Sequence, residues 1–247
     1  MKKFILITVL LFTSFSFSQL DFANQVKKKD VEKGLVTFEK TTADDGTVTY
    51  GFKMNNMPVG SQFSIDNVGV RTYSNYNKDH EEDGTTIIMN GASGEITMYT
   101  YRENKKDGPA FKMANGKIGW TKQFKKGKDD PKGYTVNHDF DYYSRNQGPT
   151  LEGFTIEKYK GSYALGYFAY GRKAYPMIQV WDEGSSYYGQ YIQGERKEFG
   201  VYFYKNGDKY IGAWNKNDME GLGFKITKSG EVIEKGFYKD NKLEISL

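Results

Sequence analysis

A 23-residue period near the C-terminus is the feature of this sequence that most restricts its fold. Successive segments between Tyr187 and Leu243 align with one another, so that Tyr191, Trp214 and Phe237 recur at intervals of 23 residues. A fixed period in the twenties is typical of repeat proteins, in which each unit contacts only its neighbours along the array. The sequence therefore predicts a repeat array rather than a conventional globular core.

Each repeat unit has the pattern of a β-hairpin. Aromatic stretches such as YYGQY and YIGAW alternate large residues with small or polar ones, which suits a strand with one buried face. A turn residue follows three positions after the last aromatic residue, at Gly194, Asn217 and Asp240. Gly and Asn tolerate positive φ and favour chain reversal. Because a lone hairpin is marginally stable in water, neighbouring hairpins are expected to share their apolar faces.

These residues resemble the MORN (membrane occupation and recognition nexus) repeat family, in an exported member of bacterial type. The family pattern is roughly YxGxWxxGxxxGxGxxxxxxG, and the departures include Glu198 and Asn217 at glycine positions. The resemblance implies an all-β fold, an elongated single sheet of successive antiparallel β-hairpins. The structural repeat positions that it marks are Tyr187, Gly189, Tyr191, Gly194, Gly200, Gly207, Tyr210, Gly212, Trp214, Gly221, Gly223, Gly230 and Phe237.

The same spacing continues towards the N-terminus. The rule of an aromatic residue, two further residues and then Gly or Asn finds FKKG at 124–127, YREN at 101–104 and, more weakly, FKMN at 52–55. We expect MORN-like repeats over 101–247, and over 35–100 either degenerate β-hairpin repeats or a small separate β-domain. A second series, one residue per unit in the strand after each turn, has a similar period and comprises Phe38, Phe63, Ile87, Phe111, Tyr134, Phe154, Met177, Val201 and Phe224.

The N-terminus predicts export. Residues 1–18 have two lysines, a short apolar run and then small residues, which is the layout of a secretory signal peptide. The alternative is a buried N-terminal strand or helix. Residues 19–34 are expected to form a linker or short helix. The mature chain is then periplasmic or extracellular with no transmembrane segment, and it is not lipid-anchored because no cysteine follows the apolar run.

Composition excludes several classes of protein. The chain has no cysteine, so disulfides and thiolate metal sites are impossible. Lys and Arg number 35 against 31 Asp and Glu, and Lys2 and Lys3 belong to the predicted signal peptide. This near-balance argues against a nucleic-acid partner. The 20 Tyr, 17 Phe and 28 Gly favour strands and turns.

The sequence contains no recognisable catalytic, cofactor or metal motif. Its two histidines, His80 and His138, lack the serine or cysteine partners of a nucleophilic site. The acidic run from Asp79 to Asp83 is similar to the start of a calcium loop, but the twelfth position is Asn90 and the flanking helices are missing. We expect no enzyme, no cofactor and no metal; the enzymatic alternative is a site built before residue 101.

Two regions are candidate binding sites. The basic stretch with Lys122, Lys125, Lys126 and Lys128 around Trp120 suits anionic lipid headgroups, although such runs also occur as ordinary solvated surface. The longest gap in the period, between residues 163 and 191, predicts either a longer binding loop or an irregular junction that extends a strand pair. Its candidate binding residues are Tyr167, Tyr170 and Tyr175.

These observations predict a non-enzymatic exported repeat protein that acts as a protein-binding or scaffolding module. The resemblance supports this expectation, because MORN sheets in general associate with proteins or lipids. The expected partner is an unidentified protein, with no nucleic acid and no small-molecule cofactor. The alternative is a peripheral binder of anionic membrane lipids that uses the lysine-rich repeat.

Overall fold

The computed structural model describes residues 25–115, 117–130, 143–144, 153–159 and 161–247, and these residues are nearly all β, with one short helix, α1 (Lys28–Glu32). The expected all-β fold of successive antiparallel hairpins is confirmed. Residues 1–18, the predicted signal peptide, lie outside the described residues, as does His138.

The first sheet contains ten strands in the described part of the chain. Neighbours in sequence are neighbours in the sheet, apart from the two-residue strand β7, which pairs only with β6. The strands are β1 (Val36–Thr42), β2 (Val48–Met54), β3 (Met57–Ile65), β4 (Val70–Tyr76), β5 (Gly84–Asn90), β6 (Glu95–Arg102), β7 (Lys105–Lys106), β8 (Gly108–Ala114), β9 (Lys117–Lys125) and β10 (Lys128–Asp129).

The second sheet also has ten strands among the described residues, again in sequence order. All of its neighbours are antiparallel except β11 and β12, which pair in parallel. The strands are β11 (Tyr143–Ser144), β12 (Gly153–Tyr159), β13 (Ser162–Ala169), β14 (Arg172–Trp181), β15 (Ser186–Ile192), β16 (Glu195–Phe203), β17 (Lys209–Asn215), β18 (Asp218–Ile226), β19 (Val232–Lys239) and β20 (Lys242–Ser246).

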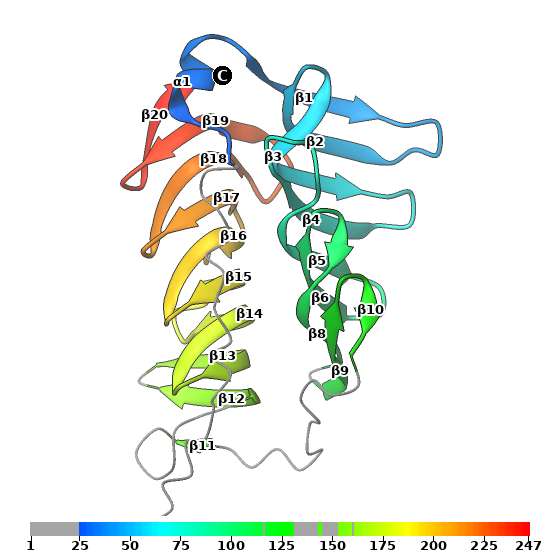
Figure 1. Ribbon diagram of the computed structural model, residues 1–247, viewed down its shortest axis with the longest axis vertical. Coiled ribbons are helices and arrows are strands. Elements are labelled where there is room, and N and C mark those ends of the chain that lie inside the picture. Colours follow the sequence, from blue (N-terminus) through cyan, green and yellow to red (C-terminus); the bar gives the residue numbers. More distant parts are fainter. Residues whose placement is uncertain (1–24, 116, 131–142, 145–152, 160) are drawn as a thin grey trace, which may run out of the picture.

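The hairpins form two sheets rather than the expected single one. Figure 1 shows β1–β10 and β12–β20 standing face to face. A single sheet with an apolar face on every hairpin would leave that face in water, and folding the array back on itself buries it. The expected boundary at residue 100 does not separate the sheets, because β6 pairs directly with β8.

One hydrophobic core fills the contact between the two sheets, which we call the seam. The rings of Phe38 and Phe52 in the first sheet lie 5.1 and 6.1 Å from that of Phe224 in the second. Polar contacts cross the seam too: Thr85 donates a hydrogen bond of 2.8 Å to Gln190. The second residue series marks this core, since Phe63, Ile87, Phe111, Val201 and Phe224 are all buried in it.

The opposite face of the second sheet explains the repeat glycines. Tyr187 is fully buried with its ring against Gly189 and Gly200, which pair with each other across β15 and β16. A Cβ atom at either glycine would overlap that ring. Tyr210 covers Gly212 and Gly223 of the next unit in the same way. The glycines are therefore required by close packing of tyrosine rings rather than by backbone conformation alone.

The turn residues form a ladder along the array. The backbone N–H groups of Gly194, Asn217 and Asn241 each donate to a carbonyl of the preceding unit, at Lys173, Arg196 and Met219. Where the residue is Asn, its side-chain oxygen also accepts from that unit, at 3.0 Å for Asn217 and 2.8 Å for Asn241. This pairing explains why Asn replaces Gly without loss of the repeat.

The gap between residues 163 and 191 does not contain a long loop. Strands β13 and β14 are joined by a tight turn at Tyr170 and Gly171, and the extra residues lengthen β14 to ten. A β-bulge between Gly166 and Tyr167 absorbs the change in register. The alternative of an irregular junction that extends a strand pair is the one observed.

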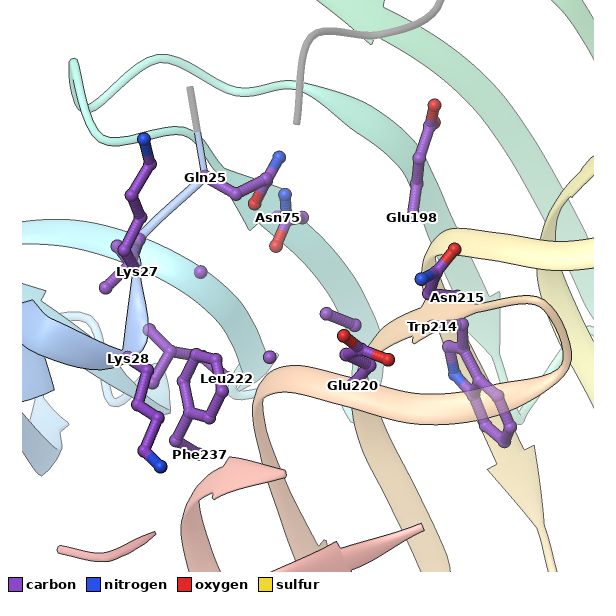
Figure 2. Close-up of a pocket in the computed structure, with 14 residues that line it drawn as sticks. Gln25, Lys27, Lys28, Asn75, Glu198, Trp214, Asn215, Glu220, Leu222 and Phe237 are labelled. Atoms are coloured by element: carbon purple, nitrogen blue, oxygen red, sulfur yellow. The ribbon is translucent and has the colours of Figure 1, made fainter. Parts of the chain in front are cut away.

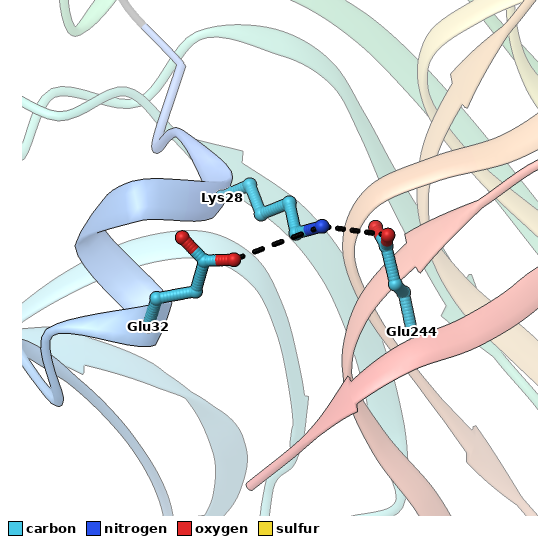
Figure 3. Close-up of polar contacts among 3 residues, drawn as sticks. All are labelled: Lys28, Glu32 and Glu244. Carbon is cyan, nitrogen blue, oxygen red and sulfur yellow. Dashed lines mark hydrogen bonds and ion pairs between the residues drawn. The ribbon is translucent and has the colours of Figure 1, made fainter.

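Helix α1 lies beside β19 and β20 at the end of the second sheet. Figure 3 shows Lys28 between two carboxylates, at 2.6 Å from Glu244 of β20 and 3.7 Å from Glu32 of the helix itself. The hydrogen bond that Lys28 donates to Glu244 raises the pKa of Lys28. Val31 of the same helix is buried in the core of the seam. The helix therefore joins the start of the described chain to its last strand.

Candidate functional site

A pocket opens at the seam where residues 25–28 pass over the two sheets (Figure 2). Its cavity volume is about 260 Å³. Both sheets contribute to it, together with the segment that leads into α1. We call it the seam pocket; it is lined by Gln25, Val26, Lys27, Lys28, Gly60, Asn75, Glu198, Ala213, Trp214, Asn215, Glu220, Gly221, Leu222 and Phe237.

The seam pocket combines apolar walls with a few polar groups. Figure 2 shows Leu222 and Phe237 together on one side, and Trp214 with Asn215 on another. The indole N–H of Trp214 donates a bond of 3.2 Å to the carbonyl of Gly200, so the ring orientation is set by β16. An apolar cavity with a small number of placed polar groups is the usual form of a binding site.

Glu198 is the unusual residue of the pocket wall. It occupies the position of a repeat glycine, equivalent to Gly221 in the next unit, and has a φ of 61° where Gly221 has 98°. This left-handed conformation costs a residue with a side chain about 1–2 kcal/mol. The backbone of β16 therefore keeps the conformation of the repeat at this position, despite the strain of a left-handed φ at Glu198.

The Glu198 carboxylate is buried without a hydrogen bond. Neither of its oxygens has a partner in the described part of the chain, and neither contacts solvent. Burial, with a smaller contribution from the charge of Asp83, raises its pKa to about 8. In Figure 2 the side chain runs from the pocket wall beside Asn215 away from Trp214.

Asp83, which directly precedes β5 of the first sheet, is the acid whose charge acts on Glu198. It is only 8% exposed, and its Oδ1 has no hydrogen-bond partner among the described residues. Burial raises its pKa to about 6, against an opposing effect of Arg102. Asn75, which also lines the pocket, donates a hydrogen bond of 3.2 Å from its side-chain amide to the Asp83 carbonyl.

The predicted lysines lie on a different part of the molecule. Lys122 forms an ion pair with Asp129, so part of the expected positive charge is neutralised. Lys125, Lys126 and Lys128 surround the turn between β9 and β10, where Asp129 and Asp130 share the same shallow hollow. The structure thus groups the lysines at one turn, with acidic residues among them.

Trp120 belongs to an aromatic cluster on the outer face of the first sheet. Its ring lies 5.9 Å from that of Tyr99, which also contacts Tyr101 at 6.3 Å and Phe124 at 6.0 Å. The Lys106 ammonium sits 3.7 Å above the Tyr99 ring. We call these five residues the outer patch. The sequence prediction named Trp120 as a candidate binding residue in this patch, and Phe124 lies in the same basic stretch. The alternation of β6 could also have indicated Tyr99 and Tyr101.

The three predicted tyrosines do not form one surface. Tyr167 is buried in the seam at 2% exposure, and Tyr175 is partly buried against the same core. Tyr170 is 70% exposed at its turn, with a φ of 52°. Only Tyr170 is therefore accessible enough to meet a partner directly.

His80 and the acidic run from Asp79 to Asp83, which the sequence analysis considered for catalysis and calcium binding, lie in and beside a turn. The Nδ1 of His80 lies 3.1 Å from the Pro58 carbonyl, and Asn77 caps the same turn by accepting from the N–H of Asp79. The described residues contain no group of three potential ligands that could hold a metal ion. Within the same ranges, no helix has the length and apolarity needed to cross a membrane.

A scan of the chain against protein-family models finds no match, and a search of curated proteins finds none either. Membership of the MORN repeat family therefore stays a prediction, based on the aligned repeat residues of the sequence.

Proposed function

We propose that this protein is a non-enzymatic, exported binding protein, and that a partner protein inserts a side chain into the seam pocket. The observation that carries the proposal is the pocket itself, with apolar walls from Val26, Leu222 and Phe237 and a polar border from Asn75 and Asn215. Binding sites between proteins often depend on one anchor residue in a desolvated pocket.

The size of the pocket favours a single side chain over a larger ligand. Its volume of about 260 Å³ lies below the roughly 300–1,000 Å³ of pockets that hold drug-sized molecules. The hydrogen bonds that cross the seam, such as Thr85 to Gln190 and Ser61 to the Leu222 carbonyl, support both walls. A rigid pocket of this kind binds with little loss of conformational entropy.

Site-specific photo-crosslinking tests this function. A photoreactive residue at Asn215, in the pocket border, is expected to capture one partner in cells that express the full chain. The same residue at Asn206, in an exposed turn of the same sheet, serves as the control and should not capture it. Equal adducts from both positions, or none from Asn215, would contradict the proposal.

A pocket-filling variant gives an independent test. Ala213 lines the pocket, so Ala213→Leu adds side-chain volume where the anchor is expected to bind. We expect this variant to lose the adduct at Asn215 while its thermal unfolding stays close to that of wild type. Ala92→Leu, in an exposed turn of the first sheet, is the matched control and should retain the adduct.

The outer patch favours a second candidate function, peripheral binding to anionic membrane lipids. Four aromatic rings accompany Lys106 on the outer face of the first sheet, and Lys125 and Lys126 lie at the turn that follows β9. Aromatic side chains suit a membrane interface, and each nearby lysine contributes about 1 kcal/mol at an anionic surface.

Vesicle sedimentation distinguishes the second function from the first. Lipid binding predicts that the protein sediments with vesicles of anionic phospholipid, stays in solution with neutral vesicles, and dissociates at high salt. The variant Lys125→Glu with Lys126→Glu should then lose sedimentation, whereas Lys216→Glu, an exposed lysine of the second sheet, should not. Sedimentation that is unaffected by the double substitution rejects the lipid function.

A further inference from the structure

Two acids with buried carboxylate oxygens belong to segments of opposite sheets that contact each other. Asp83 directly precedes β5 of the first sheet, and Glu198 lies in β16 of the second. Their neighbours show how closely these strands approach, since a Cβ atom at Gly84 would be 3.8 Å from the Cβ of Phe199. The acids are therefore part of the contact between the sheets rather than of either sheet alone.

Both acids are compensated less than a buried charge normally is, although the Gly84 backbone N–H donates a hydrogen bond to the Asp83 carboxylate. Oδ1 of Asp83 and both carboxylate oxygens of Glu198 are buried without hydrogen bonds in the described ranges. Burying an ionised carboxylate without partners is costly, and two such charges also repel one another. A carboxyl group that holds a proton avoids this cost and becomes a hydrogen-bond donor.

The surrounding charges do not remove the need for a proton. Arg102 of β6 lowers the pKa of both acids, and Lys197 of β16 lowers that of Glu198. These effects are outweighed by burial, while Glu81 and Glu103 act on Asp83 in the same direction as burial.

The strands on either side of Glu198, β15 and β17, also bring side chains close to this acid. On β15, burial raises the pKa of the Tyr187 hydroxyl, and the charge of Glu198 adds a smaller effect in the same direction. On β17, the residue paired with Glu198 is Trp214, which carries no charge. Neither strand supplies a cation that would neutralise the pair.

We propose that Asp83 and Glu198 form a proton-binding site between the two sheets, and that loss of its protons weakens the seam beside the pocket. A glycine would satisfy the backbone at position 198, as Gly221 does in the next unit. The acidic side chain is therefore an addition to the repeat rather than a requirement of it. The site makes the contact between β5 and β16 dependent on pH.

The sign of the pH dependence follows from the pKa directions. Both folded-state pKa values, about 6 for Asp83 and about 8 for Glu198, lie above the ordinary range of carboxyl groups. The folded state therefore binds protons more tightly than the unfolded state. The stability that the pair contributes is complete at acidic pH, and it is lost as pH rises through about 6 and then about 8.

Denaturant unfolding of the full chain between pH 5.5 and pH 9 tests the proposal. The wild type should lose at least tenfold in its folding equilibrium constant across this range. Asp83→Asn should remove the small part of the loss that falls below about pH 6, Glu198→Gln the larger part that extends to about pH 8, and the double variant both. Glu220→Gln changes a pocket carboxylate outside the pair and should follow the wild type. Equal pH slopes in the wild type and the double variant would overturn the proposal.

Two further measurements keep the test decisive. All variants are also measured with both histidines, His80 and His138, changed to Gln, so that a difference in pH slope comes from the two acids. If the acid variants fail to fold, carbon-13 NMR of the wild-type carboxyl groups gives the answer directly. Two carboxyl transitions above pH 5.5 are expected, and transitions for both groups below pH 5 would exclude the site.

Discussion

The two sheets share one hairpin plan but fill their outer faces differently. In the second sheet, Tyr187 and Tyr210 cover pairs of facing glycines. In the first sheet the corresponding space at Gly51 is filled by Gln62, which donates 2.7 Å to the carbonyl of Phe52 and 3.1 Å to that of Val59. Thr100 covers Gly108 and donates 2.9 Å to the Pro109 carbonyl.

This difference shows which positions the fold requires and which belong only to the repeat pattern of the second sheet. Both sheets place large apolar residues at the seam, such as Phe52 and Phe111 in the first and Phe199 and Phe224 in the second. The outer faces need only a side chain that covers the close approach of two strands. Tyrosine over glycine is one solution, and glutamine or threonine over glycine is another. The first sheet therefore has the same hairpin arrangement without these repeat residues.

The largest effect is expected in the seam, where the two sheets should behave alike. Phe52→Ala and Phe224→Ala each remove a fully buried ring from the same core and should each cost about 3–5 kcal/mol. Both variants should unfold in a single transition when denaturant unfolding is monitored by circular dichroism. Two separate transitions, each sensitive to only one substitution, would show that the sheets are independent.

The outer faces should respond differently to a single added methyl group. Gly200→Ala places its Cβ against the rigid Tyr187 ring and should cost about 3 kcal/mol. Gly51→Ala meets only the flexible end of Gln62 and should cost about 1–2 kcal/mol. Gly91→Ala, with its nearest neighbour at 3.8 Å, is the control and should change the free energy of unfolding by less than about 0.5 kcal/mol. Equal costs at Gly51 and Gly200 would remove the distinction between the two faces.

Restoring the repeat glycine should stabilise the second sheet. Glu198→Gly relieves a left-handed φ and removes a buried carboxyl group, with an expected gain of about 1–2 kcal/mol at neutral pH. Gly221→Ala introduces a side chain at the equivalent position and should lose about 1–2 kcal/mol. Chemical denaturation measures both changes. A loss of stability in Glu198→Gly would contradict the strain assigned to this residue.

The smallest effect concerns the cations on the two outer faces. The Arg196 guanidinium lies 4.4 Å from the Trp214 ring centre and also donates 2.9 Å to the Asn217 carbonyl. Arg196→Met should therefore cost about 1–2 kcal/mol, and Lys106→Met over Tyr99 only about 0.5–1 kcal/mol. Thermal unfolding ranks the two variants, and the reverse order would show that the first sheet depends more on its outer face.

Local pattern predicted the hairpins but not their arrangement. The residue series that includes Phe63, Ile87 and Phe224 identified the seam because one residue per unit faces it. Met177 of that series lies in the outer cluster instead, in the strand that pairs with the bulge at Gly166. Nothing in the period indicated that the array divides into two sheets, since the same alternation suits a single sheet with one wet face.

The candidate site was harder to predict because it joins distant parts of the chain. Glu198 was visible as a departure from the glycine pattern, but its neighbour Asp83 gave no matching signal. The pocket also needs Gln25 and Val26, which precede the repeats. The lysine stretch was visible as composition, yet its ion pair between Lys122 and Asp129 depends on the pairing of β9 with β10.

The contact between Phe38 and Phe224 tests the face-to-face arrangement most directly. The ring centres of these residues, in β1 and β18, are 5.1 Å apart. In one continuous sheet they would be many strands apart, at about 4.8 Å per strand. Selective labelling of phenylalanine should give a nuclear Overhauser effect between the two rings, lost in Phe38→Leu. Its absence from an otherwise assigned wild-type spectrum would contradict the packing of two sheets on one core.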